Sequence, residues 1–277
     1  METISNLIRT ISSHNRLQIL SDLHLEVGNQ YSSYTFPVAA PFLLLGGDIG
    51  RLVEYGAYRE FLEAQAHRFE KIFLVLGNQE FYGLDYESGL QKGLRLSKEP
   101  SLVDKLVLLN RSRWDDSHSN LSILGCTLWS AIPVTAVGVV ETKVKDFKKI
   151  NKWTAQRHDS VHAEELAWLR EQVALASASK RRILIATHHA PCIKRSSRPE
   201  HLSNPWTPAF GTDLLSSEKW KGVKTWVFRH THYSTDFTQN GIRVVANQRG
   251  YVLPSMPSST GGKHTIDKFD AAKTVPL

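Results

Sequence analysis

The sequence LQILSDLH (residues 17–24) joins a short apolar run to a carboxylate and an imidazole. The run, Leu17–Leu20, has the length and composition of a buried β-strand. Residues two apart on an extended chain point in the same direction, so we expect Asp22 and His24 to face one point. Along the rest of the chain, strand-like runs are again followed by polar side chains.

The pattern of apolar residues predicts the fold class. Helical spacing covers Glu54–Glu70 and Asp159–Ser177, and Asp159 or Ser160 is expected to cap the second helix. Strands that alternate with helices predict a layered α/β fold. The strand-like runs that follow the first are Phe42–Leu45, Ile72–Leu76, Leu121–Leu124, Ile183–Ala186, Thr225–Phe228 and Ile242–Ala246.

Polar residues follow five of the seven runs. In open α/β sheets, ligands bind beyond the carboxyl ends of the strands, so these residues are expected to meet at one edge. His230 and His232 are two apart, as Asp22 and His24 are. After the first run, the polar ends read Gly46-Gly47-Asp48, Gly77-Asn78-Gln79-Glu80, Thr187-His188-His189 and Arg229-His230-Thr231-His232.

These polar ends supply carboxylates, imidazoles and one amide oxygen, and they predict a metal centre. Nitrogen and oxygen ligands of this kind suit ions such as manganese, iron or zinc. Seven ligands are too many for one tetrahedral ion and suit two ions that share a bridging carboxylate. A single histidine is more typical of a core residue, and a single D-x-H arises by chance. Five polar segments in this order, each directly after a strand-like run, instead favour a metal centre. The candidates are Asp22, His24, Asp48, Asn78, His188, His230 and His232.

Composition limits the function classes. The 277 residues carry a formal charge of +7, which allows an anionic ligand. The densest basic stretch, 143–152, is broken by Asp146 and favours a solvated helix face over a nucleic-acid surface. No run reaches the roughly 18 apolar residues of a membrane span, and the first twenty residues lack a signal peptide's apolar stretch. We therefore expect a cytoplasmic protein with a small, anionic substrate; nothing indicates an oligomeric state.

Other features concern domain organisation and the surroundings of the site. Residues 1–277 are expected to form one domain, with flexible segments at 1–15 and 254–266, and the two cysteines suit a reducing compartment. We expect a long surface loop over Pro191–Pro208 and a short last strand within Lys268–Val275. Candidates for lining a substrate pocket or steering an anion are Trp153, Trp206, Arg249, Tyr251, Lys194, Arg195 and Arg198.

The ordered motifs resemble those of the calcineurin-like metallophosphoesterase superfamily, whose pattern is D-x-H, G-D, G-N-H-D/E, H and G-H-x-H. The flanking segments are similar to fungal and bacterial members of a Ser/Thr phosphatase-like branch. The resemblance implies a four-layer α/β sandwich of two packed mixed β-sheets flanked by helices, with a dimetal site at one edge. It also implies that Asp22, His24 and His232 hold the first metal, that Asn78, His188 and His230 hold the second, and that Asp48 bridges them.

Two positions depart from the family pattern. Gln79 stands where the family has a histidine that acts near the phosphate, and glutamine cannot titrate. Arg229 stands where the family usually has glycine; it could grip a phosphate or carboxylate, or point to solvent. His189 is an alternative proton donor, with His158 and His162 as weaker ones.

Three hypotheses for the function follow from the motifs and their departures. The first is a dinuclear metal-dependent hydrolase of a small phosphoester, in which a metal-bridging hydroxide attacks phosphorus. The second is an enzyme of secondary metabolism that uses the same metals as Lewis acids on a non-phosphate substrate. The third is a catalytically weakened binding protein, against which the intact set of ligands argues.

Overall fold

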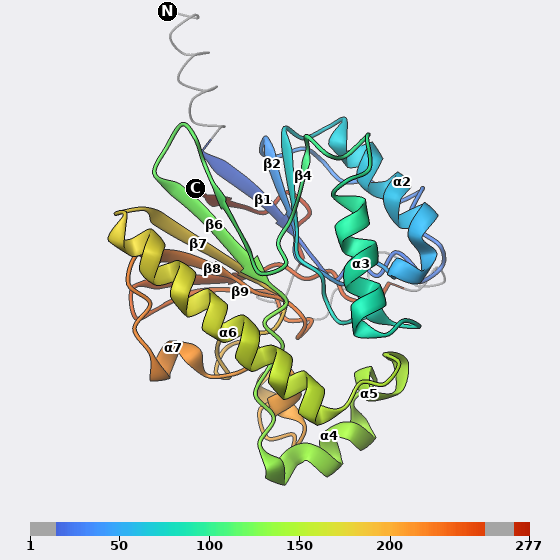
Figure 1. Ribbon diagram of the computed structural model, residues 1–277, viewed down its shortest axis with the longest axis vertical. Coiled ribbons are helices and arrows are strands. Elements are labelled where there is room, and N and C mark those ends of the chain that lie inside the picture. The colour runs from blue at the N-terminus through green and yellow to red at the C-terminus, as the bar shows by residue number, and fades with distance from the viewer. Residues whose placement is uncertain (1–14, 253–268) are drawn as a thin grey trace, which may run out of the picture.

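Two β-sheets form the centre of the protein in the computed structural model, which describes residues 15–252 and 269–277 (Figure 1). The first sheet has the strand order β11-β1-β2-β3-β4, and the second has the order β5-β6-β7-β8-β10-β9. The strands of the first sheet are β1 (Arg16–Leu20), β2 (Phe42–Leu45), β3 (Lys71–Leu74), β4 (Leu106–Leu108) and β11 (Thr274–Pro276). Those of the second are β5 (Ser112–Asp115), β6 (Leu121–Cys126), β7 (Arg182–Thr187), β8 (Val223–Val227), β9 (Thr235–Gln239) and β10 (Ile242–Ala246).

Both sheets are mixed. In the first, β1 to β4 run parallel and β11 pairs antiparallel with β1. In the second, β6, β7, β8 and β10 run parallel, and β5 and β9 pair antiparallel at the two edges. Because the central strands of each sheet are parallel, their carboxyl ends lie at one edge.

Side chains that alternate along the strands divide the core into layers. Leu17, Ile19 and Leu44 from the first sheet pack in one cluster with Leu184 and Ala186 from the second, so this cluster lies between the sheets. Their neighbours along each strand belong to clusters on the outer faces. Strands that are buried on both faces explain the nearly continuous apolar runs of the sequence.

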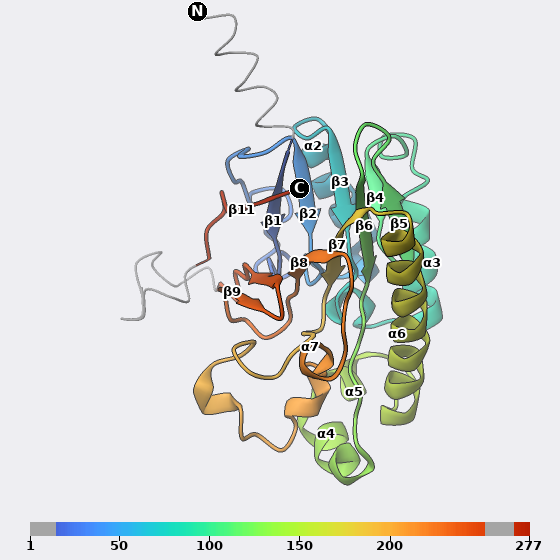
Figure 2. The ribbon, with the colours of Figure 1, turned by 90° about the vertical axis from the view of Figure 1, so that its left-hand side faces the viewer.

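Helices cover both outer faces, which completes a four-layer α/β sandwich (Figure 1). The outer face of the first sheet packs against α2, and that of the second against α6. Figure 2 shows α4, α5 and the segment between β7 and α7 beyond the carboxyl ends of the strands. The helices are α2 (Tyr55–Ala66), α3 (Tyr86–Leu96), α4 (Val137–Lys143), α5 (Asp146–Lys149), α6 (Ala155–Ala178) and α7 (Leu214–Ser217). The predicted fold class is therefore confirmed.

The start of α6 corrects the sequence interpretation. Neither Asp159 nor Ser160 caps this helix, which begins four residues earlier. Thr154 is the N-cap, and its hydroxyl accepts a hydrogen bond from the backbone N–H of Arg157 at 3.1 Å. The Asp159 carboxylate instead accepts a hydrogen bond from the N–H of Ile132 at 3.2 Å, which ties the helix to the segment after β6.

Strands that the apolar pattern did not predict are short or lie at edges. β5 and β9 are edge strands with several exposed or half-buried polar residues, and β4 has three residues. The expected last strand within Lys268–Val275 overlaps β11, Thr274–Pro276, at Thr274 and Val275. The segments expected to be flexible, 1–15 and 254–266, lie outside the described residues except for Asn15. Within residues 15–252 and 269–277, no helix is long and apolar enough to cross a membrane.

A buried carboxyl group fastens α6 to the end of β6. Glu165 is fully buried, and its Oε2 accepts a hydrogen bond from the backbone N–H of Leu128. Burial raises the pKa of Glu165 from 4.5 to about 8. The folded protein therefore holds a proton at this group over a pH range in which the unfolded chain has lost it.

Glu165→Gln tests this consequence for stability. Because the pKa is higher in the folded state, the stabilisation is complete below pH 4.5 and is lost as the pH rises through 8. We expect the wild-type free energy of unfolding to fall relative to Glu165→Gln by on the order of 3 kcal/mol between pH 5 and pH 8. Urea unfolding at several pH values measures the difference. The matched control is Glu164→Gln, at an exposed neighbour, and equal pH slopes for wild type and Glu165→Gln would refute the assignment.

Candidate metal centre

The seven predicted ligands converge at the carboxyl edge of the two sheets, from strands of both. Asp22 and His24 follow β1, Asp48 follows β2, Asn78 follows β3 and His188 follows β7. The segment after β8 supplies the two remaining histidines. All of these residues except His232 are buried. The expectation that strand ends gather the polar side chains is thus met by the geometry.

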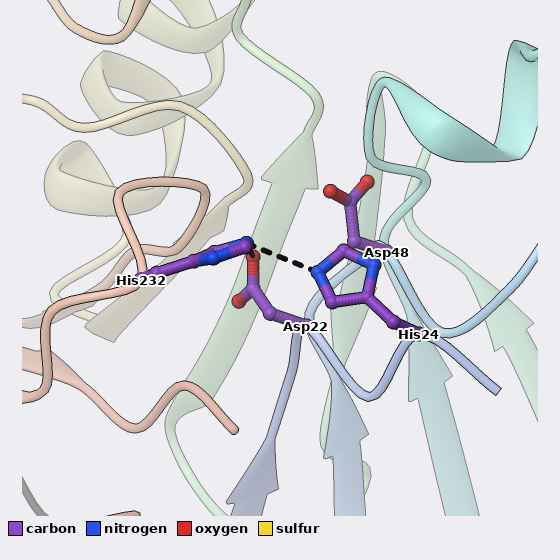
Figure 3. A group of neighbouring side chains, drawn as sticks. All are labelled: Asp22, His24, Asp48 and His232. Carbon is purple, nitrogen blue, oxygen red and sulfur yellow. Dashed lines mark hydrogen bonds and ion pairs between the residues drawn. The ribbon is translucent and has the colours of Figure 1, made fainter. Parts of the chain in front are cut away.

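One group of potential ligand atoms comprises Asp22, His24, Asp48 and His232 (Figure 3). One atom from each of these residues lies within 4.8 Å of all the others. His24 Nε2 is 3.0 Å from His232 Nε2, which in turn is 3.6 Å from Asp22 Oδ1. Figure 3 shows the two imidazole rings and the Asp22 carboxylate meeting, with the Asp48 side chain as the fourth member of the group.

A second group adjoins the first and shares Asp48 with it. It comprises Asp48, His188 and His230, again with potential ligand atoms within 4.8 Å of one another. His188 Nε2 is 3.5 Å from Asp48 Oδ1 and 3.2 Å from His230 Nδ1. Asn78 Oδ1 lies 3.0 Å from the same His188 nitrogen. Two buried His/Asp clusters joined by one carboxylate are consistent with a dinuclear metal site.

The backbone reaches this arrangement through left-handed turns. Asp22 and His24 both have φ of 49°, Asp48 has 52°, His230 has 78° and His232 has 52°. Non-glycine residues seldom adopt this region, and where they do, the conformation often marks a functional site. The paired residues do converge, but the predicted reason, that they lie on extended chain, is wrong. Left-handed turns directly after the strands orient their side chains.

Glycine at position 77 allows close packing around the shared carboxylate. A Cβ atom on Gly77 would lie 2.3 Å from Asp48 Oδ1 and 2.6 Å from His188 Cε1. A larger residue here would displace both side chains. The glycine of the G-N-Q-E motif is thus explained by the approach of the β3 loop to the site.

The residues fit metal ions in charge as well as in position. Burial lowers the pKa of His188 to about 4 and that of His230 well below its usual value, so both imidazoles are neutral and carry lone pairs at pH 7. Burial, together with the charges of Glu80 and Asp22, raises the pKa of Asp48 well above its usual value. Nearby cations would offset this cost. Asp22 Oδ1 and His230 Nε2 are buried without a hydrogen-bond partner in the described structure.

Glu80 holds the backbone around Asp48. Its carboxylate is buried and accepts hydrogen bonds from the N–H groups of Asp48 and Ile49 at 2.9 Å and of Gly77 at 2.7 Å. The Tyr58 hydroxyl donates a fourth, at 3.0 Å. Glu80 therefore ties the β2 loop to the β3 loop, a role that its place in the motif did not reveal.

Asp146 orients the amide of Asn78. Its Oδ1 accepts hydrogen bonds from Asn78 Nδ2 at 2.7 Å and from the Tyr82 hydroxyl at 2.6 Å. Because the amide nitrogen is held there, Asn78 Oδ1 points toward His188. Sequence reasoning treated Asp146 as an interruption of a basic run. The signal that could have identified it is an acid between buried apolar neighbours, Val144 and Ile150.

Gln79 lies at the mouth of the centre. It lines a cavity of about 410 Å³ together with Asp48, Asn78, His230, His232 and Tyr251. Its Nε2 donates a hydrogen bond to the Tyr251 hydroxyl. The Tyr251 ring stacks on His24 with a centroid distance of 4.0 Å. A glutamine–tyrosine pair therefore occupies the position where the motif pattern predicts an ionisable group.

The alternative proton donors lie away from this cavity. His189 is fully buried and stacks behind His230, with ring centroids 4.3 Å apart. His158 is hydrogen-bonded to Ser130, and His162 is within hydrogen-bond distance of the Leu128 carbonyl. Burial lowers the pKa of all three histidines. None of these three candidate proton donors lines the cavity at the metal centre.

Arg229 also takes a position that the sequence did not predict. It is fully buried and neither points to solvent nor lines the cavity. Its Nη1 donates to the Phe228 carbonyl at 2.9 Å, and a Cβ on Gly46 would lie 1.8 Å from its Nε. Burial lowers the pKa of Arg229 to about 9. Arg229 therefore fills space beneath the β2 loop.

Basic residues surround the cavity on its solvent side. Lys143 and Lys145 line it, so the stretch 143–152 is more than a solvated helix face. From the loop after β7, Arg198 and Trp206 line it as well, whereas Arg195 packs over the ring of Phe237. Arg249 and Trp153, which were expected as candidates for lining the pocket, do not line this cavity. Arg249 donates to the Leu23 carbonyl, and Trp153 is buried in the core.

The shared position of Asp48 generates a prediction about metal content. We expect two transition-metal ions in each wild-type chain and, in Asp48→Asn, either none or one that is weakly held, because the variant removes the common carboxylate. Plasma emission spectroscopy of protein purified without chelator gives the stoichiometry. Asp104→Asn, at an exposed position, is the control. Two fully occupied sites in Asp48→Asn would rule out a bridging role.

Asp146→Ala tests the support of Asn78. Without Asp146 the amide keeps only the longer hydrogen bond from its Nδ2 to the Tyr82 hydroxyl, at 3.2 Å, and is held less firmly. One of two bound ions should therefore dissociate about 10–100-fold more readily while the other is retained. Asp146→Asn keeps an acceptor oxygen and should lose less. Titration with Mn²⁺ after chelation measures both affinities, and circular dichroism verifies folding. Unchanged affinity at both sites in folded Asp146→Ala would show that Asn78 needs no such support.

Comparison with known proteins agrees with this geometry. A family model described as calcineurin-like phosphoesterase matches residues 16–234, which include all seven candidate ligands. Uncharacterized protein L509 of Acanthamoeba polyphaga mimivirus is 26% identical over 261 residues, which span 85% of this chain and 91% of that protein. The crystal structure of phosphopantetheinyl hydrolase (PptH) from Mycobacterium tuberculosis shares the fold, with a TM-score of 0.66 at 16% identity over 87% of this chain and 91% of that one.

The family match covers most of the chain, and the family consists of metal-dependent phosphoesterases and related hydrolases. The strand-end ligands, the two mixed sheets and their order along the chain all accord with it. This chain belongs to the calcineurin-like phosphoesterase family.

Proposed function

We propose that this protein hydrolyses a small phosphoester at a centre of two metal ions. The observation that most supports the proposal is the carboxylate of Asp48, which belongs to both groups of potential ligands. Asp22, His24 and His232 would hold one ion, and Asn78, His188 and His230 the other. When bound, two such ions activate a water molecule as nucleophile and stabilise the charge on the oxygens of an in-line displacement.

The side chains around the cavity suit a phosphoryl group. Lys143, Lys145 and Arg198 place three cations on its solvent side, where they attract an anion. Gln79 Nε2 and the Tyr251 hydroxyl lie together at the mouth and offer hydrogen-bond donors to substrate oxygens. Asp48 keeps its position because Glu80 fixes the backbone on either side of it.

Gln79 supports a second candidate function. A glutamine can donate a hydrogen bond but cannot protonate a leaving alkoxide, a step typically worth 10²–10⁴-fold in rate. The alternative is therefore an enzyme of secondary metabolism whose metals act as Lewis acids on a non-phosphate substrate. The three histidines considered above do not replace the missing acid, because His189, His158 and His162 are buried and do not line the cavity. The retained ligand set argues against a protein that only binds.

Gln79→His distinguishes these functions. A nitrophenolate departs without a proton, so wild type should cleave 4-nitrophenyl phosphate, whereas an alkyl phosphate should be nearly inert. Gln79→His should raise kcat/KM for the alkyl ester by about 10²-fold or more, with a smaller gain on the aryl ester. Metal content should stay the same, because the neighbouring Asn78 is the candidate ligand.

Gln79→Ala is the matched control, since it removes the amide and supplies no acid. It should show no gain on either ester. If wild type loaded with Mn²⁺ leaves 4-nitrophenyl phosphate intact, the phosphoesterase proposal fails. If Gln79→His gains nothing on the alkyl ester, the absence of an acid at position 79 is not what limits cleavage.

A further inference from the structure

A second cavity lies beside the one at the metal centre. It has a volume of about 320 Å³ and is formed mainly by the loop between β7 and α7, which lies beyond the strand ends (Figure 2). Its lining includes Cys192, Ile193, Ser197, Asn204, Trp206 and Phe210. Nothing in the site described above uses most of them.

The two cavities share a boundary. His201, Trp206, Phe210 and Thr231 line both of them. The Phe210 ring stacks on the candidate ligand His230, with centroids 4.8 Å apart. The second cavity therefore begins one aromatic ring away from the metal centre, which is close enough for one small molecule to occupy both.

The two cavities differ sharply in charge. The metal-centre cavity is lined by Lys143, Lys145 and Arg198, together with two carboxylates. The second cavity has no Lys, Arg, Asp or Glu in its lining. Ile193, Trp206 and Phe210 give it apolar walls, and the polar groups between them are hydroxyls, one amide and the imidazole of His201. Burial raises the pKa of Cys192 to about 12, so this thiol is neutral as well.

We propose that the second cavity binds the organic part of the substrate, and that this part is an uncharged, mainly apolar alkyl or aryl group. The inference rests on the proposed function, because it places the phosphoryl group at the metal centre. A charged group would lose hydration in the second cavity without gaining a Lys, Arg, Asp or Glu side chain of opposite sign as its partner. An apolar group would leave water for the walls formed by Trp206 and Phe210.

The test measures binding, so it does not depend on turnover. Methylphosphonate and octylphosphonate carry the same anionic head and differ in the length of an uncharged chain. Isothermal titration of the full-length, Mn²⁺-loaded protein with each gives two dissociation constants. Burial of a methylene group is worth about fourfold in affinity, so burial of three of the seven additional carbons should tighten octylphosphonate by about 60-fold over methylphosphonate. 7-Carboxyheptylphosphonate, which ends in a charge, should lose most of this gain.

Two variants locate the chain within the second cavity. Ser197→Phe and Asn204→Phe fill it from half-buried positions that do not line the metal-centre cavity. Each should abolish the chain-length gain and leave methylphosphonate binding unchanged. Ser203→Phe lies in the same loop, lines neither cavity and should keep the gain. With two filling variants, one that fails to fold does not remove the test.

The outcomes separate this inference from the proposed function. If methylphosphonate binds and octylphosphonate binds no more tightly, the inference is wrong and the phosphoryl site stands. If the gain persists in both filling variants, the chain lies elsewhere and the inference is likewise overturned. If neither phosphonate binds the metal-loaded protein, the proposed function fails, and this inference fails with it.

Discussion

The burial of one carboxylate, Asp48, between two groups of imidazoles is the constraint on which the site depends. Its position in both groups of potential ligands determines the number of cations the centre is suited to hold. A buried anion is costly unless positive charge compensates it. Glu80, also buried, lies directly behind and adds to the negative charge. Because the buried acids lie beside neutral imidazoles, bound cations would compensate their negative charge.

The fold fixes this carboxylate by backbone geometry. Parallel strands from both sheets end at one edge, and left-handed turns at Asp22, Asp48 and His230 aim side chains inward from three of them. Gly77 lets the β3 loop approach the carboxylate, and Glu80 ties that loop to the β2 loop. The strained turns persist because the packed sheets hold both ends of each loop.

Strand ends and the candidate ligands after them could be predicted from the sequence because both depend on local pattern. Apolar runs of strand length mark buried strands, and the polar residues after Leu20 and Leu45 follow directly. The orientation of the side chains that pack against the candidate ligands could not be predicted in this way. Arg229 turns inward beneath Gly46, and His189 stacks behind His230, because of packing between distant segments. Asp146 accepts a hydrogen bond from Asn78, which lies 68 residues earlier in the chain, so no local sequence pattern could have predicted this contact.

Residues other than the candidate ligands also determine the chemistry of the cavity. Gln79 and Tyr251 replace an ionisable group at the mouth with a hydrogen-bonded pair. The most direct test of the central claim is an anomalous diffraction map of crystals grown with Mn²⁺. It should contain two peaks about 3.5–4 Å apart, with the Asp48 carboxylate in contact with both. A single peak, or two peaks of which only one contacts Asp48, would contradict the shared carboxylate.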